Sequence, residues 1–96
     1  GENILQLGEN ADAVLGRYQE GEKTYFLLLV EYSDEKKASA VFNNFMVVYM
    51  PGANEAGLIE TNDGKWTGAR TLGSLLMIVW DAPSKMKVDE VFSKVK

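Results

Sequence analysis

The sequence predicts an α+β fold: a two-layer sandwich in which an antiparallel sheet of about five strands carries two helices on one face, in the order ββα-βββα. Apolar residues fill positions 25–30 and 75–80 without alternation, which is typical of strands that are central in a sheet or covered on both faces. A segment with the apolar spacing of an amphipathic helix follows each run. An offset of about fifty residues superimposes the two units, so the pattern also suggests an internal duplication.

The N-terminal half is expected to contain two strands and a helix. Residues 1–11 form a lead-in segment without a sustained apolar period, and residues 12–96 form the single domain. Residues 13–18 predict the first strand and residues 23–32 the second, and a polar turn containing Gly21 joins them.

The first helix is expected to begin after Ser33, which is a suitable N-cap, and to end at about Met50, because Pro51 cannot continue a helix. Its apolar positions recur three and four residues apart and predict one buried stripe. The members of this stripe are Ala38, Val41, Phe42, Phe45, Val48 and Tyr49.

The C-terminal half is expected to contain three strands and a helix. Residues 58–61 and 66–72 predict two strands around the Asp63-Gly64 turn, and Gly68 marks a bulge in the second of them. Residues 75–81 predict the other central strand, and Ser84 caps the last helix. The apolar stripe of that helix consists of Val88, Val91, Phe92 and Val95.

Composition limits the function classes. The chain has 96 residues, the size of one domain, and a formal net charge of −4, which opposes binding to nucleic acid. It contains no histidine and no cysteine, so it lacks the commonest metal ligands, thiol nucleophiles and neutral-pH proton carriers. The apolar runs are too short to span a bilayer. We therefore expect no cofactor, no metal site and no catalytic residues.

Carboxylates are the remaining groups with catalytic potential. Glu31 and Asp81 end corresponding apolar strands, and two adjacent carboxylates could divide the roles of acid and base in a hydrolase. A structural interpretation competes with this one, in which Arg70 on the adjoining strand pairs with Asp81. Oxygen-bearing side chains near the third strand could also bind calcium, although their spacing fits no EF-hand. These are Asn54, Glu55, Glu60, Asn62 and Asp63.

A second apolar strip is expected on the first helix, opposite the main stripe. It consists of Ala40, Val47 and Met50, and Trp66 beside the Asp63-Gly64 turn is the aromatic residue most expected to be exposed. Either the lead-in segment or another chain or domain covers this strip, and the weakly apolar lead-in favours the latter. These four residues form the predicted interaction surface.

One resemblance rests on residues 27–32, 49–52, 63–66 and 78–85, together with Phe42, Phe45 and Ala69-Arg70. Through these residues, from about residue 23 onward, the chain resembles the C-terminal half of an uncharacterised bacterial family known only as a domain of unknown function. The resemblance implies an extracytoplasmic location, in the periplasm or at the cell surface. It also implies an upstream half and, as in secreted lipoproteins, a lipid anchor on a preceding N-terminus. It implies no catalytic residues.

The leading hypothesis is a non-catalytic interaction module of a larger exported bacterial protein, which binds a protein partner through the sheet edge or the helix strip. The partner is the upstream half of the same protein or a second copy. Two alternatives stay open: a carboxylate-based hydrolase site around Glu31 and Asp81, and a cytoplasmic structural subunit that self-associates by sheet pairing.

Overall fold

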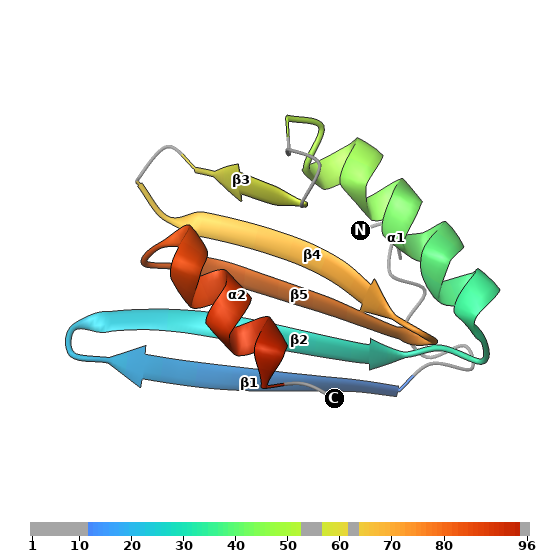
Figure 1. Cartoon of the computed structure of the whole chain (residues 1–96), viewed down its shortest axis with the longest axis horizontal. Helices are drawn as coiled ribbons and strands as arrows, with labels where there is room; N and C mark the ends of the chain where they lie inside the picture. Colours follow the sequence, from blue (N-terminus) through green and yellow to red (C-terminus); the bar gives the residue numbers. More distant parts are fainter. Residues whose placement is uncertain (1–11, 53–56, 62–63, 95–96) are drawn as a thin grey trace.

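The computed structural model describes residues 12–52, 57–61 and 64–94, and the expectations about the lead-in segment and Val95 lie outside these ranges. Five strands and two helices follow one another in the predicted order (Figure 1). The elements are β1 (Asp12–Glu20), β2 (Lys23–Glu31), α1 (Glu35–Tyr49), β3 (Leu58–Glu60), β4 (Trp66–Leu72), β5 (Leu75–Ala82) and α2 (Lys85–Ser93). The α+β class and the five-stranded antiparallel sheet are confirmed.

The strands lie in the order β1-β2-β5-β4-β3, and all neighbours are antiparallel. The two apolar runs thus form β2 and β5, which are adjacent interior strands, as the sequence predicted. The hairpin partners β1 and β4 flank them, and β1 is an edge strand. Figure 1 shows β1 along the lower edge of the sheet and the short β3 at the upper edge.

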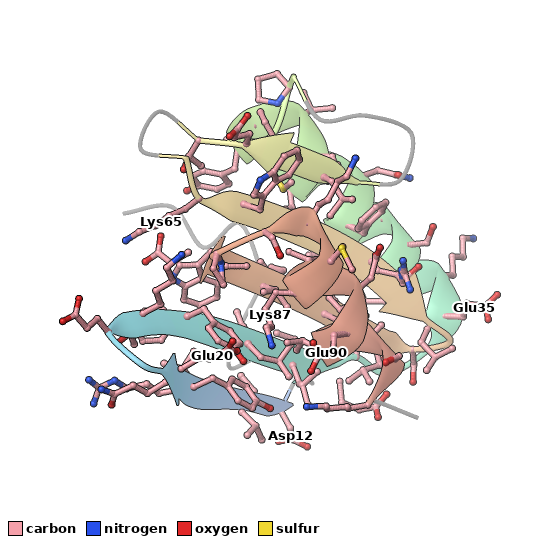
Figure 2. All side chains as sticks on the ribbon, turned by 60° about the vertical axis from the view of Figure 1, so that its left-hand side comes forward. Asp12, Glu20, Glu35, Lys65, Lys87 and Glu90 are labelled. Atoms are coloured by element: carbon pink, nitrogen blue, oxygen red, sulfur yellow. The ribbon has the colours of Figure 1, made fainter. Side chains whose placement is uncertain are left out.

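The two helices lie on opposite faces of the sheet, so the prediction of both helices on one face was wrong, and the described domain has three layers. Successive strand residues point to opposite faces, and the alternate residues of β2 and β5 belong to two separate cores. The α2-side core contains Tyr25, Leu27, Leu58, Met77, Val79, Ala82, Val88, Val91 and Phe92. The α1-side core contains Val30, Tyr32, Ala38, Val41, Met50, Ala69, Leu76 and Ile78. In the view of Figure 2, α2 lies in front of the sheet and α1 behind it.

A β-bulge in β5 explains the exchange of faces. Trp66 pairs with Ala82 and Gly68 pairs with Val79, so β5 contains one residue more than β4 in this interval. Asp81 absorbs the extra residue with φ 62°, a left-handed conformation that asparagine and aspartate tolerate better than most residues. The sequence placed the irregularity correctly at Gly68, but the inserted residue lies on the neighbouring strand.

The bulge changes the face to which the end of β5 points. Strict alternation from Val79 would place Ala82 on the α1 side, yet Ala82 packs in the α2-side core. The chain then enters α2 on that face. With an offset of fifty residues, Val30 of the first unit corresponds to Trp80 of the second. Val30 faces α1, the helix of its own unit, whereas Trp80 faces away from α2, the helix of its own unit. The two units are therefore not equivalent in the sheet, and the structure adds no support to an internal duplication.

Local signals at the helix ends were mostly correct. Ser84 caps α2 by accepting a hydrogen bond from the Lys87 backbone at 3.1 Å, as expected. The N-cap of α1 is Asp34 rather than Ser33, because the Asp34 carboxylate accepts the bond from the Lys37 backbone at 2.7 Å. A charged acceptor at this position also complements the helix dipole.

The predicted buried stripe of α1 holds for only part of the helix. Ala38 and Val41 are buried, but Val48 and Tyr49 in the last turn are 48% and 58% exposed. A helix stripe is buried only where a sheet lies beneath it, and α1 packs on β4 and β5. The final turn therefore presents two stripe residues to solvent.

Candidate functional site

The two carboxylates that the sequence paired lie at opposite ends of the sheet. Glu31 is opposite Leu75 at the start of β5, whereas Asp81 is close to the other end of that strand. At about 3.3 Å per residue, this separates the two acids by about 20 Å. Glu31 instead accepts a hydrogen bond from the Ser74 hydroxyl. Antiparallel pairing of β2 and β5 is the physical reason, because it brings the end of one strand to the start of the other.

Arg70 does not pair with Asp81, so that expectation was also wrong. Its guanidinium lies 3.7 Å from the Asp89 carboxylate and 4.8 Å from the centre of the Phe92 ring, both on α2. These contacts hold Arg70 against the helix on the α2 side of the sheet. With the acids apart and the arginine engaged elsewhere, the described residues do not assemble the predicted two-carboxylate site.

Metal binding has no structural support within the described ranges. Residues 12–52, 57–61 and 64–94 contain no group of three or more acidic side chains that could hold a metal ion. Of the five residues considered for calcium, Glu60 ends β3, and the other four lie outside the described residues. In the same part of the chain, no helix has the length and apolarity needed to cross a membrane.

The predicted interaction surface is only partly exposed. Ala40 is exposed, and Val47 is 73% exposed on α1. Met50, however, is only 3% exposed and belongs to the α1-side core, so its assignment to an exposed strip was wrong. Met50 is the C-cap, where φ −133° and ψ 48° leave the helical path, and helical periodicity no longer predicts its direction. Trp66 is half-buried and packs against the α2-side core.

Two hollows formed by described residues open on the surface, and neither of these two has the character of a small-molecule pocket. One, of about 560 Å³, lies between α1 and the β4–β5 turn and is lined by Glu35, Lys36, Ser39, Ala40, Asn43, Thr71 and Gly73. The other, of about 360 Å³, lies near the β5 bulge and is lined by Glu22, Lys23, Thr24, Phe26, Gly64, Lys65, Asp81 and Pro83. Ligand pockets are lined mainly by apolar and aromatic side chains, whereas most of these residues are polar or charged.

The edge strand β1 carries exposed apolar side chains that sequence reasoning did not single out. Val14 is 64% exposed and Leu15 is 60% exposed, and as consecutive strand residues they project from opposite faces. No charged residue lies between Asp12 and Arg17. Charges in an edge strand normally oppose edge-to-edge pairing, so this segment is weakly protected. Its apolar character is visible in the sequence, but its position at the sheet edge is not.

The hairpin between β1 and β2 determines which backbone groups of β1 face outward. Glu20 is opposite Lys23 across a two-residue turn in which Gly21 has φ 61°. The pair that closes such a turn is a hydrogen-bonded pair, and hydrogen-bonded pairs alternate along an antiparallel ladder. Tyr18, Gly16 and Val14 therefore bond to β2. The N–H and C=O groups of the intervening residues, Ala13, Leu15, Arg17 and Gln19, point away from the sheet.

An ion cluster connects β1 to α2 at the end of the hairpin. The Lys87 ammonium lies 2.7 Å from the Glu20 carboxylate and 3.1 Å from the Glu90 carboxylate, and Figure 2 shows Lys87 between these two acids. The hydrogen bond to Glu20, followed by that to Glu90, raises the pKa of Lys87. The same contact with Lys87 lowers the pKa of Glu90. The cluster ties one end of β1 to the body of the domain and leaves the segment around Leu15 accessible.

Neither family models, nor curated proteins, nor solved structures gave a match when compared with this chain.

Proposed function

We propose that this chain is a non-catalytic protein-interaction module that binds an extended protein segment along the outer edge of β1. The exposure of Val14 and Leu15 on a nine-residue edge strand carries this proposal. In strand addition, main-chain hydrogen bonds provide much of the affinity and alternate side chains provide specificity. The outward backbone groups of Ala13, Leu15 and Arg17 supply the first of these, and Val14 and Leu15 supply the second.

The chemistry of the described residues supports a binding role. The chain has no histidine or cysteine, and the two acids that could have formed a catalytic pair are at opposite ends of the sheet. The two hollows lined by described residues are largely polar. The resemblance to an exported bacterial family supports an extracytoplasmic location and a place within a larger protein.

The exposed end of α1 is a second surface, consisting of Val47, Val48 and Tyr49. It lacks the alternating row of outward N–H and C=O groups of an edge strand, because the N–H groups in this turn bond within the helix. We therefore favour the β1 edge, and the experiment below separates the two surfaces.

A probe peptide tests the proposal directly. An acetylated and amidated peptide of alternating threonine and valine, with a lysine at each end for solubility, is titrated into the isotope-labelled protein. We expect shifted and more protected backbone amides at Ala13, Leu15 and Arg17. Arg17→Pro should weaken binding about tenfold, because proline removes an outward donor and obstructs the approach of a new strand.

Val47→Glu is the matched control, since it places a charge on the exposed end of α1 and leaves the edge intact. It should not change peptide binding. Loss of binding in Val47→Glu, with Arg17→Pro unaffected, would place the interaction surface on α1. The absence of amide changes along β1 at saturating peptide would refute the strand-addition proposal.

A further inference from the structure

We infer that the edge of β1 pairs with β1 of a second copy of this chain, antiparallel and with Leu15 opposite Leu15, which joins two sheets into one. This inference rests on the proposed function of the β1 edge and names its partner. The self-complementarity of the strand in backbone groups, side-chain faces and charge supports it.

Symmetry restricts the registers that are available. Two edges pair in an antiparallel manner about a twofold axis perpendicular to the sheet, and this axis keeps the α1 side of both copies on one side. Residues opposite each other must therefore project from the same face, so they must be an even number of positions apart in the sequence. Near the centre of β1, the residue on the axis can then be Val14, Leu15, Gly16 or Arg17. In each register, outward backbone groups of one copy lie opposite outward backbone groups of the other.

Charge and overlap distinguish these four registers. Centring the pair on Arg17 places Arg17 opposite Arg17 of the second copy, and this like-charge pair is destabilising. Centring the pair on Gly16 uses all of β1 but places Asp12 opposite Glu20 at both ends, and like charges directly opposite each other are destabilising. Centring it on Val14 overlaps only residues 12–16. Centring it on Leu15 overlaps residues 12–18, forms about six main-chain hydrogen bonds, and opposes no like charges.

The contacts expected in the Leu15 register are favourable on both faces. Ala13 lies opposite Arg17 of the second copy, and Asp12 lies opposite its Tyr18, where the phenol can donate to the carboxylate. On the α1 side, Leu15 is beside Leu28, which is beside Ile78 of β5. Pairing Leu15 with its own copy therefore extends one apolar row across both sheets and covers a side chain that is 60% exposed in the single chain.

The size of the contact predicts a reversible dimer. An interface limited to two strand edges remains below the roughly 1,200 Å² of buried surface that stable complexes usually exceed. We therefore expect association that depends on concentration and is half complete at micromolar concentrations or above, on the order of the affinities of transient complexes.

Single-cysteine cross-linking measures the register, because the natural chain contains no cysteine. Val14→Cys, Leu15→Cys and Gly16→Cys are each oxidised under identical conditions, together with Met86→Cys as the control, a position on α2 whose wild-type side chain is 77% exposed and thus at least as accessible as the other three. Hydrogen-bonded partners have Cα atoms about 5.5 Å apart, a distance that a disulfide spans without strain. We expect Leu15→Cys to form covalent dimer at least about fivefold faster than the other three variants.

Leu15→Cys cross-linking no faster than Met86→Cys would overturn the inference, and preferential cross-linking of Val14→Cys or Gly16→Cys would overturn its register. Sedimentation velocity of the cysteine-free chain provides a second measurement. Leu15→Lys should abolish the dimer, whereas Met86→Lys should retain it. Binding of the probe peptide along β1 without any self-association would refute the second copy as partner and leave the proposed function standing. If the probe peptide does not bind along β1 and the chain does not self-associate, both the proposed function and the second copy as partner are refuted.

Discussion

Replacing Gly68 with alanine should destabilise the domain, because no space exists for the added methyl group. A Cβ atom at this position in β4 would lie 2.5 Å from Val88 Cγ1 and 2.8 Å from Leu58 Cδ2. Carbon atoms in normal contact are about 3.5–4.0 Å apart, so these groups must separate by about 1 Å. Val88 is fully buried and cannot move into solvent. The close contact thus concentrates strain where α2 packs on the sheet.

The magnitude follows from the balance of two effects. Overpacking of this kind costs about 1–3 kcal/mol. The conformational restriction of the unfolded chain by alanine offsets about 0.4–1 kcal/mol of this cost, because Gly68 does not have a positive φ. We expect a net loss of about 1–2 kcal/mol in the free energy of unfolding. For a domain of this size, each kilocalorie lowers Tm by about 4–8 °C.

Urea denaturation and thermal melting of four variants test this reasoning. Gly16→Ala is the matched control, because a Cβ there meets nothing closer than 3.5 Å and should be neutral or stabilising. Val88→Ala alone should cost about 1.5–3 kcal/mol through lost burial. The double variant Gly68→Ala with Val88→Ala should be less destabilised than the sum of the single variants by about 1 kcal/mol, because each change provides room for the other. Strict additivity, or a Gly68→Ala variant as stable as wild type, would refute the packing argument.

Three further predictions concern the core, the bulge and the response to pH. Phe92→Ala should cost about 3–5 kcal/mol of unfolding free energy in urea denaturation, since Phe92 is buried in the α2-side core; an unchanged midpoint would place it outside the core. Asp81→Gly should leave stability unchanged or raise it by up to about 1 kcal/mol, whereas Asp81→Val should lower it, because a β-branched residue is strained at positive φ; equal melting temperatures for the two variants would contradict the bulge geometry. Glu90 has a lowered pKa in the folded state, so its contribution to stability is present above the ordinary glutamate pKa of about 4.3 and is lost as the pH falls through the folded value. Between neutral and acidic pH, the urea midpoint should therefore decrease less for Lys87→Met than for wild type. An equal decrease in both proteins would show that Lys87 does not cause the lowered pKa of Glu90.

Functional prediction from the sequence succeeded least, because it depended on which residues meet in space. The exclusion of histidine and cysteine chemistry is direct, since those residues are absent. The proposed proximity of Glu31 and Asp81 failed because it assumed corresponding positions in two units, and antiparallel pairing separates them. The burial of Met50 could not be predicted either, because its direction is determined at the C-cap, where the helical period ends.

The sequence alone determined the class and number of the elements, because local signals control them. Apolar runs defined β2 and β5, apolar spacing defined the helices, and Ser84 and Pro51 marked helix ends, since these effects act over a few residues. Only the tertiary structure decided that the helices cover opposite faces and that β1 is an edge. One inserted residue at Asp81 moves Ala82, and the entry into α2, to the other face of the sheet, and strand order depends on contacts between distant segments.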